Sequence, residues 1–246
     1  MTETSLEFEE SSWKSLYRVG GVAALIIVTV ALIEIMITFF PEGNAPQQTV
    51  GDWFSLFENN WFFGLRNLGL LNIIITLLGI PAFLALYGAH RQVNQAYAML
   101  AMIIFFIGVA IFLATNRVFP MLELSHHYTA ATTDAQKTIA LAAGQAMLAV
   151  GRSHSPGTWL GFFLSEIAGF TISVVMLKGK IFSRATAYAG IVGFSCLMVF
   201  ELLSSFVPSL ADAAMILAMI GGLSSMAWYI LLARRLFQLG RTGSQT

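Results

Sequence analysis

The sequence is poor in charge, and this sets its class. Only 11% of its 246 residues are charged, against roughly 25% in an ordinary soluble domain, while 57% are hydrophobic. The net charge is zero, from 13 basic and 13 acidic residues, so no overall field favours nucleic acid as a partner. The composition therefore predicts a membrane protein whose main partner is the lipid bilayer.

The sequence also has little cysteine and no short catalytic motif. Cys196 is the only cysteine and lies inside a hydrophobic run, which excludes an internal disulfide, a cysteine-rich zinc site and c-type haem attachment. There is no HExxH or CxxC motif, no GxSxG elbow, no Walker loop and no GxGxxG that opens a helix. We therefore expect no cofactor on the basis of motifs.

Six hydrophobic stretches are present and are long enough to cross a membrane. About 30 Å of hydrocarbon requires about 20 helical residues. The stretches are Tyr17–Phe40, Leu68–Gly88, Tyr97–Phe119, Thr158–Leu177, Ala185–Val207 and Leu210–Ala233. Because backbone groups in lipid must be satisfied within the segment, runs of this length are helices. The sequence predicts an all-α fold, a polytopic membrane helical bundle that forms a single transmembrane domain over residues 1–246.

Lysine and arginine are divided unequally between the two sides of this bundle. Six spans place both termini on the same side as the second and fourth loops. That side holds nine basic residues, which are Lys14, Arg18, Arg91, Lys178, Lys180, Arg184, Arg234, Arg235 and Arg241. The other side holds four, which are Arg66, Arg117, Lys137 and Arg152. Because positive charge is enriched on the cytoplasmic side, both termini are predicted to be cytoplasmic.

Two outer loops are predicted to contain helices that lie in the extracytoplasmic interface. In residues 49–67, the residues Phe54, Phe57, Trp61 and Phe62 repeat at helical spacing, which indicates an amphipathic helix. In the second loop, a capping box at Thr133 opens an Ala-rich run to Val150. A seventh span there would place the C-terminus outside, so we expect a surface helix.

Three acidic residues within the spans are predicted to share one depth. Glu166 lies seven residues after Trp159 at the outer end of the fourth span, which places it about 10 Å deep. Glu34 and Glu201 each precede the last hydrophobic residue of an outward-running span by six residues, or about 9 Å. The three carboxyls therefore indicate a polar layer near the extracytoplasmic surface.

The fourth span also carries a ridge of small residues, which are Gly161, Ser165, Gly169 and Ser173. Such ridges allow helices to approach closely, and Glu166 borders this one, so we expect it to point into the bundle. An ionisable group within a span costs about 2.5 to 3.5 kcal/mol on insertion scales and needs a partner. Arg66 and Arg117 are the candidate partners, and the acids outnumber them. The predicted ligand-binding residues are Glu166, Glu34, Glu201, Arg66, Arg117, Asn72 and Asn116.

Three histidines on the outer side allow an alternative site. His126, His127 and His154, together with Glu123 or Glu166, could form a zinc site of the catalytic type. Adjacent histidines on a helix diverge by about 100°, so His126 and His127 could share a metal ion only in a loop. The alternative interpretation is that all three are surface histidines without a bound metal ion.

The second half of the chain resembles a known family. The runs ALAAGQAMLAV and LGFFLSEIAGFTISVVMLKGKIFSRATAYAGIVG are similar to the bacterial multispan membrane family catalogued as domain of unknown function 4386. The matching residues are Gly144, Gln145, Lys180, Phe182, Arg184, Ala189, Gly190 and Gly193. Ser183 stands where that family usually has proline. The resemblance implies a fold of six or seven spans and no established activity. We expect the protein in the bacterial inner membrane.

Three hypotheses for function follow. The first is an acidic intramembrane pocket that binds a proton, a cation or a small amphiphile in a transport-like role. The second is a membrane-embedded metal-dependent hydrolase, with the three histidines holding zinc and Glu166 as general base. The third is a structural subunit whose small residues, including Ala214, Ala218 and Gly222, pack against a helix of another protein.

Overall fold

The computed structural model describes residues 3–38 and 47–241, and these residues form helices and no strand. Six helices are long and apolar enough to cross a membrane. They are α1 (Glu3–Thr38), α4 (Leu70–His90), α5 (Gln95–Thr115), α8 (Trp159–Gly179), α9 (Arg184–Phe206) and α10 (Ala211–Arg241). This confirms the predicted all-α polytopic bundle. The predicted end of the first span at Phe40 lies outside the described residues.

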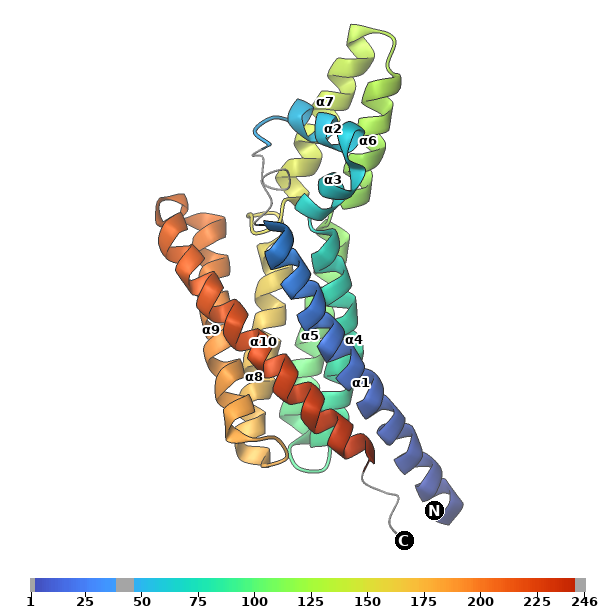
Figure 1. Cartoon of the computed structure of the whole chain (residues 1–246), viewed down its shortest axis with the longest axis vertical. Helices are drawn as coiled ribbons and strands as arrows, with labels where there is room; N and C mark the ends of the chain where they lie inside the picture. The colour runs from blue at the N-terminus through green and yellow to red at the C-terminus, as the bar shows by residue number, and fades with distance from the viewer. Residues whose placement is uncertain (1–2, 39–46, 242–246) are drawn as a thin grey trace.

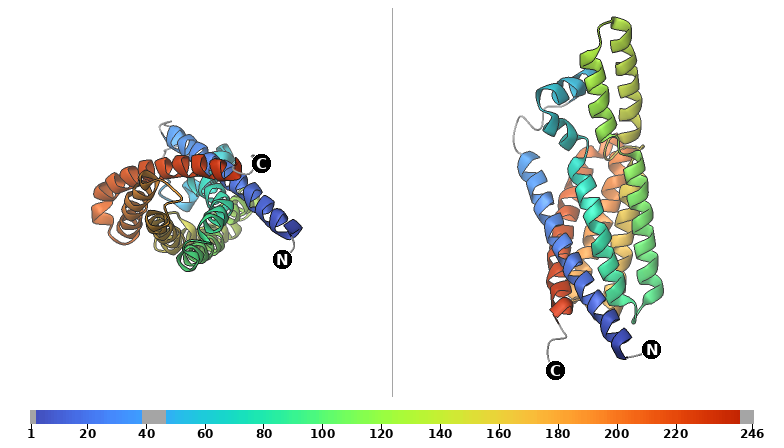
Figure 2. Two further views of the ribbon diagram at one scale, coloured as in Figure 1. Left: turned by 90° about the horizontal axis from the view of Figure 1, so that it is seen from below. Right: turned by 90° about the vertical axis from the view of Figure 1, so that its right-hand side faces the viewer.

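The six long helices form a ring (Figures 1 and 2). Each packs against the next long helix along the chain, and α10 completes the ring by packing against α1. We call the end where α1 begins and α10 ends the terminal end, and the opposite end the cap end. Near the terminal end α1 and α10 are in contact, with the Arg18 guanidinium donating to the Gly240 carbonyl. Towards the cap end the two helices diverge (Figure 1).

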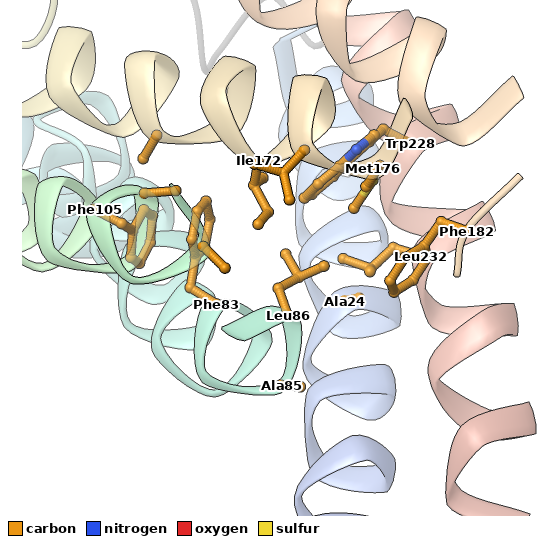
Figure 3. Packing of buried hydrophobic residues seen from close by; sticks show 14 of the residues in the cluster. Ala24, Phe83, Ala85, Leu86, Phe105, Ile172, Met176, Phe182, Trp228 and Leu232 are labelled. Atoms are coloured by element: carbon orange, nitrogen blue, oxygen red, sulfur yellow. The ribbon is translucent and has the colours of Figure 1, made fainter. Parts of the chain in front are cut away.

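An apolar core occupies the ring, and Figure 3 shows side chains from several helices meeting in it. Phe83 of α4 and Phe105 of α5 stack with ring centroids 4.0 Å apart. Trp228 and Leu232 of α10 are fully buried against residues of α8 and α9. The core forms because each helix buries one apolar stripe and leaves the rest of its apolar surface to lipid.

Glycines set how closely these helices approach. A Cβ on Gly190 would overlap the Ser173 hydroxyl and lie 2.6 Å from Trp228 Cδ1. A Cβ on Gly20 would lie 2.6 Å from the Cβ of Ala85. The first contact holds α8, α9 and α10 together, and the second holds α1 against α4, so both positions require glycine.

Beyond the cap end lies a second cluster of helices, which we call the cap (Figure 2). It consists of α2 (Val50–Asn59), α3 (Trp61–Asn67), α6 (Val118–Ala130) and α7 (Asp134–Gly151). Phe54, Phe57 and Met121 are buried in a core of its own. The cap therefore has its own packing and is joined to the bundle by short connections.

The first predicted interfacial helix is two helices. Asn60 leaves the helical conformation, with φ −154° and ψ 87°, and its side chain accepts from the Phe63 N–H to cap α3. Phe54 and Phe57 are buried as the amphipathic pattern requires, but Trp61 is 60% exposed because it follows this break. An asparagine cap inside an apolar run was the signal for the break.

The second predicted surface helix is α7, and its capping box is present, with Thr133 Oγ accepting from the Gln136 N–H. It does not lie flat as expected. It packs against α6, and the pair extends along the long axis of the molecule (Figure 1). Gly144 allows α7 to approach α2 as well, since a Cβ there would overlap Val50 and come within 3.0 Å of Phe54.

Candidate functional site

Two of the predicted acids lie together at the cap end of the bundle. Glu166 of α8 is 8% exposed and Glu201 of α9 is fully buried, and the two carboxyls are near enough to interact electrostatically. Both face the interior because α8 and α9 pack directly against each other. We call these two residues, with His154, the carboxyl site.

The small-residue ridge winds slowly around α8, and this explains why Glu166 faces α9. Gly161 lies against Phe112 of α5, whereas Gly169 lies against Phe194 of α9. Residues four apart on an α-helix drift by about 40°, so a ridge that begins on α5 reaches α9 two turns later. Glu166 lies between the two glycines along the axis and about 60° beyond Gly169 around it, on the side that approaches Glu201.

His154 connects the two carboxyls of this site to the surface. Its Nδ1 lies 2.6 Å from Glu201 Oε2, and its side chain is 37% exposed. The ring stacks on Phe162 at 4.6 Å between centroids and meets Phe200 edge-on at 5.0 Å. The backbone of His154 has φ 54°, a left-handed conformation that costs about 1–2 kcal/mol for a residue other than glycine. The bond to Glu201 and the two rings hold this conformation.

The polar atoms of the two carboxyls are satisfied unequally. Glu201 also accepts from the Ser205 hydroxyl at 3.4 Å. Glu166 Oε2 is enclosed, and within the described part of the chain it has no hydrogen-bond partner. A buried carboxyl oxygen without a partner is costly, so this atom is the least satisfied polar group of the carboxyl site.

The third predicted acid lies in a different contact. Glu34 of α1 pairs with Arg66 of α3, with Oε1 and Nη2 2.8 Å apart. The Arg66 guanidinium also donates to the Glu34 carbonyl, the Thr38 hydroxyl and the Asn67 side chain. These bonds join the end of α1 to the cap. The predicted single layer of three acids is therefore divided into an ion pair and the carboxyl site.

The remaining predicted residues surround the junction between the cap and the bundle. The Arg117 guanidinium donates to the carbonyls of Ala114 and Asn116 at the end of α5, where it offsets the negative end of the helix. Asn116 accepts from the Val118 N–H. Its Nδ2 and that of Asn72 lie 3.6 Å and 3.7 Å from where a Cβ on Gly69 would be, and the φ of Gly69 is 104°.

Among the residues missed from the sequence, Ser153 has the clearest position. Its hydroxyl is also close to Gly69, 2.9 Å from where a Cβ would be. It precedes His154, so one short loop reaches both the junction and the carboxyl site. No pattern in the sequence marks it, because its position depends on the left-handed conformation of the next residue.

The three histidines do not come together. His126 and His127 lie on α6, where both approach Glu123, with His127 Nε2 3.1 Å from Glu123 Oε1. His154 is bonded to Glu201 instead. Residues 3–38 and 47–241 contain no group of three His, Cys, Asp or Glu side chains placed to hold a metal ion. The helical conformation of 126 and 127 separates their rings, as their adjacency indicated.

The small residues of α10 that were predicted to pack against another protein differ in how buried they are. Ala214 is buried within the bundle, whereas a Cβ on Gly222 would meet no atom within 4 Å. Ala218 is half-buried. The three therefore do not form one exposed face.

Comparisons with known proteins give one match. The sequence model of a family described as Domain of unknown function (DUF4386) matches residues 58–234, which include α4 to α9, most of α10 and both acids of the carboxyl site. No curated protein and no solved structure matches the chain.

Proposed function

This chain belongs to the DUF4386 family, and we propose that it binds a proton at the carboxyl site in a transport-like role. Glu166 is the binding group, Glu201 shares the proton, and His154 exchanges it with the aqueous side. The single observation that supports this most strongly is the enclosed, unpartnered Oε2 of Glu166 beside a second buried carboxyl.

The charges around the site support a proton or cation as ligand. Arg66 is bonded to Glu34, and Arg117 to carbonyls of α5. Within the described residues neither Glu166 nor Glu201 has an ion pair with lysine or arginine. Two neighbouring carboxylates in a low-dielectric interior repel strongly, and one shared proton is the smallest ligand that removes the repulsion.

His154 supports a route for the proton. An imidazole can accept a proton on one ring nitrogen and release one from the other. Its Nδ1 contacts Glu201 while part of the ring is exposed, and the flanking rings of Phe162 and Phe200 fix its direction. The route would run from the cap-side surface through His154 to Glu201 and then to Glu166.

We place the cap on the extracytoplasmic side of a bacterial inner membrane. The nine basic residues of the terminal side and the four of the cap side are distributed as the positive-inside rule requires. Fusion of a reporter that is active only in the cytoplasm to the end of the chain tests this placement. An inactive reporter at the C-terminus would contradict it.

The test of proton binding is infrared difference spectroscopy on protein reconstituted in lipid, between neutral and alkaline buffer. We expect a protonated-carboxyl band that is lost in Glu166→Gln and shifted in Glu201→Gln. The matched control is Glu34→Gln, which changes an acid of similar depth that already has a cationic partner, and it should leave the band unchanged. The same band in Glu166→Gln as in the unmodified protein would contradict the proposal.

A second measurement separates a proton from a metal cation. The spectra are repeated with sodium or potassium chloride at constant ionic strength set by choline chloride. A band that does not depend on the metal ion supports the proton. Loss of the band with one of these ions would identify that ion as the ligand and overturn the assignment to a proton.

A further inference from the structure

At the terminal end, opposite the carboxyl site, we propose a second binding site, which takes the anionic headgroup of a membrane phospholipid. The site is a pocket of about 370 Å³ between the α8–α9 turn and the last turns of α10. Three cationic residues line it, Lys180, Arg234 and Arg235. Basic pockets between helices at this level of a membrane bind phosphate headgroups.

The cationic groups are available to an anion. Arg235 Nε donates to the Ile181 carbonyl at 2.7 Å and Nη1 to Gln238 Oε1 at 3.1 Å. These two bonds orient its guanidinium, and Nη2 has no partner within residues 3–38 and 47–241. Lys180 and Arg234 are exposed, and neither has an ion pair in that same part of the chain. A guanidinium held in this way is suited to phosphate oxygens.

The first turn of α9 adds to the positive potential. Ser183 and Thr186 line the same pocket, and the Ser183 hydroxyl accepts from the Thr186 N–H to cap the helix. The start of a 23-residue helix has a partial positive charge from its unpaired N–H groups. This charge has the same sign as the three side chains, so an anion is favoured from both walls.

The apolar wall identifies the anion as a lipid headgroup. Ile181, Phe182 and Leu231 line the pocket beside the cations, and Phe182 packs in the bundle core beside Leu232 (Figure 3). On α10, Ile230 and Leu223 lie one and three turns before Arg234 on the same side of the helix, and they are 48% and 64% exposed. The surface therefore continues from the pocket as an apolar stripe along the span. A phospholipid has groups that match both surfaces in this order. Its phosphate would lie beside the cations at the helix ends, and its acyl chains would lie along the apolar side of α10.

The conformation of Lys180 allows a clean test. Its φ of 55° favours glycine, so Lys180→Gly removes the charge and relieves backbone strain. Combined with Arg234→Gln, it removes two charges, and neither side chain has a hydrogen bond or ion pair within the described residues. The matched control is Lys178→Gln with Arg184→Gln, which removes two exposed charges from the same end but outside the pocket.

The experiment is calorimetric titration of delipidated protein in neutral detergent with dihexanoyl phosphatidylglycerol. We expect saturable binding that the pocket variant weakens by about 10- to 30-fold and the control by less than about threefold. Equal weakening in both variants would show attraction to the general charge of that end and overturn the site. Equal binding of dihexanoyl phosphatidylcholine would overturn the requirement for an anion.

A titration with glycerol 3-phosphate distinguishes a lipid ligand from a soluble phosphate ligand. It carries a phosphate headgroup without acyl chains, so we expect at least about tenfold weaker binding than for the lipid. Equal affinity, lost in the pocket variant, would make the ligand a soluble phosphate and overturn the lipid. These outcomes do not depend on Glu166, so they are separate from the test of proton binding.

Discussion

The half of the molecule at the terminal end, which we call the terminal half, and the half that includes the cap, which we call the cap half, are held together in different ways. In the described residues ten polar side chains are buried, and only His90, Ser173 and Thr186 of these lie in the terminal half. That half is packed through glycine and large apolar side chains such as Trp228. The cap half has two buried carboxyls and an ion pair with a buried guanidinium.

The difference indicates which half is the scaffold and which contains the site. Close apolar packing tolerates little change of volume, so the terminal half fixes the relative positions of the six helices. Buried polar groups contribute little net stability and are retained where they have a role. The carboxyl site lies in the half where α1 and α10 diverge, and the tightly packed terminal half supports its helices.

The largest expected effect is on the packing of the terminal half. Gly190→Leu should lower the free energy of unfolding by about 3 kcal/mol or more, because the new side chain overlaps Ser173 and the buried Trp228. The measurement is thermal unfolding in detergent, followed by circular dichroism.

The matched control is Gly222→Leu on α10, where a Cβ meets no atom within 4 Å. Leucine there should be neutral or stabilise by up to about 1 kcal/mol, because it favours the helix over glycine. Similar destabilisation in both variants would mean that close packing of α8, α9 and α10 does not distinguish the terminal half.

The sequence assigned the polar residues to one height but could not place them around the ring. Hydropathy places Glu34, Glu166 and Glu201 at one depth, since depth depends on the rise per residue alone. Their separation depends on helix neighbours. Glu34 is on α1, which packs against α4 and α10, whereas α8 packs against α5 and α9. Which helices become neighbours is decided by packing of the whole ring, so only the structure could divide the three acids.

Local signals gave some details and missed others. The ridge from Gly161 to Ser173 indicated the buried face of α8, because close approach requires small side chains at four-residue spacing. His154 was assigned only to a metal site or to the surface. Its bond to Glu201 spans 47 residues and depends on a positive φ, and neither feature leaves a pattern in a single sequence.

A smaller effect is expected where polar contacts join the two parts of the cap half. Arg66→Ala should lower the free energy of unfolding by about 1–3 kcal/mol, because it removes the bonds from α3 to Glu34 and Thr38. In a double-mutant cycle with Glu34→Gln, the two changes should be coupled by about 1 kcal/mol. Additive effects would contradict the role of this ion pair in attaching α1 to the cap.

The smallest effect is expected in the cap itself, at the exposed Asp52 of α2. Hydrogen bonds lower the pKa of this carboxyl, first from the Thr49 backbone N–H at 2.7 Å, then from the Thr49 hydroxyl and the Gln48 N–H. Because the pKa of Asp52 in the folded state lies below the unfolded value of about 3.9, the ionised carboxylate stabilises the folded α2 at neutral pH. This stabilisation is lost as pH falls through the folded pKa.

Asp52→Asn should therefore increase amide exchange in α2 at neutral pH, relative to the unmodified protein measured at the same pH. The difference should disappear in acid, where the unmodified carboxyl is also protonated. Glu58→Gln is the matched control, since it changes another exposed acid of the same helix that is outside the capping box. An Asp52→Asn difference that persists in acid, or an equal change with Glu58→Gln, would show that α2 does not depend on the capping box at Thr49 and Asp52. The helices of the cap would then be held together by their apolar contacts, as the terminal half is.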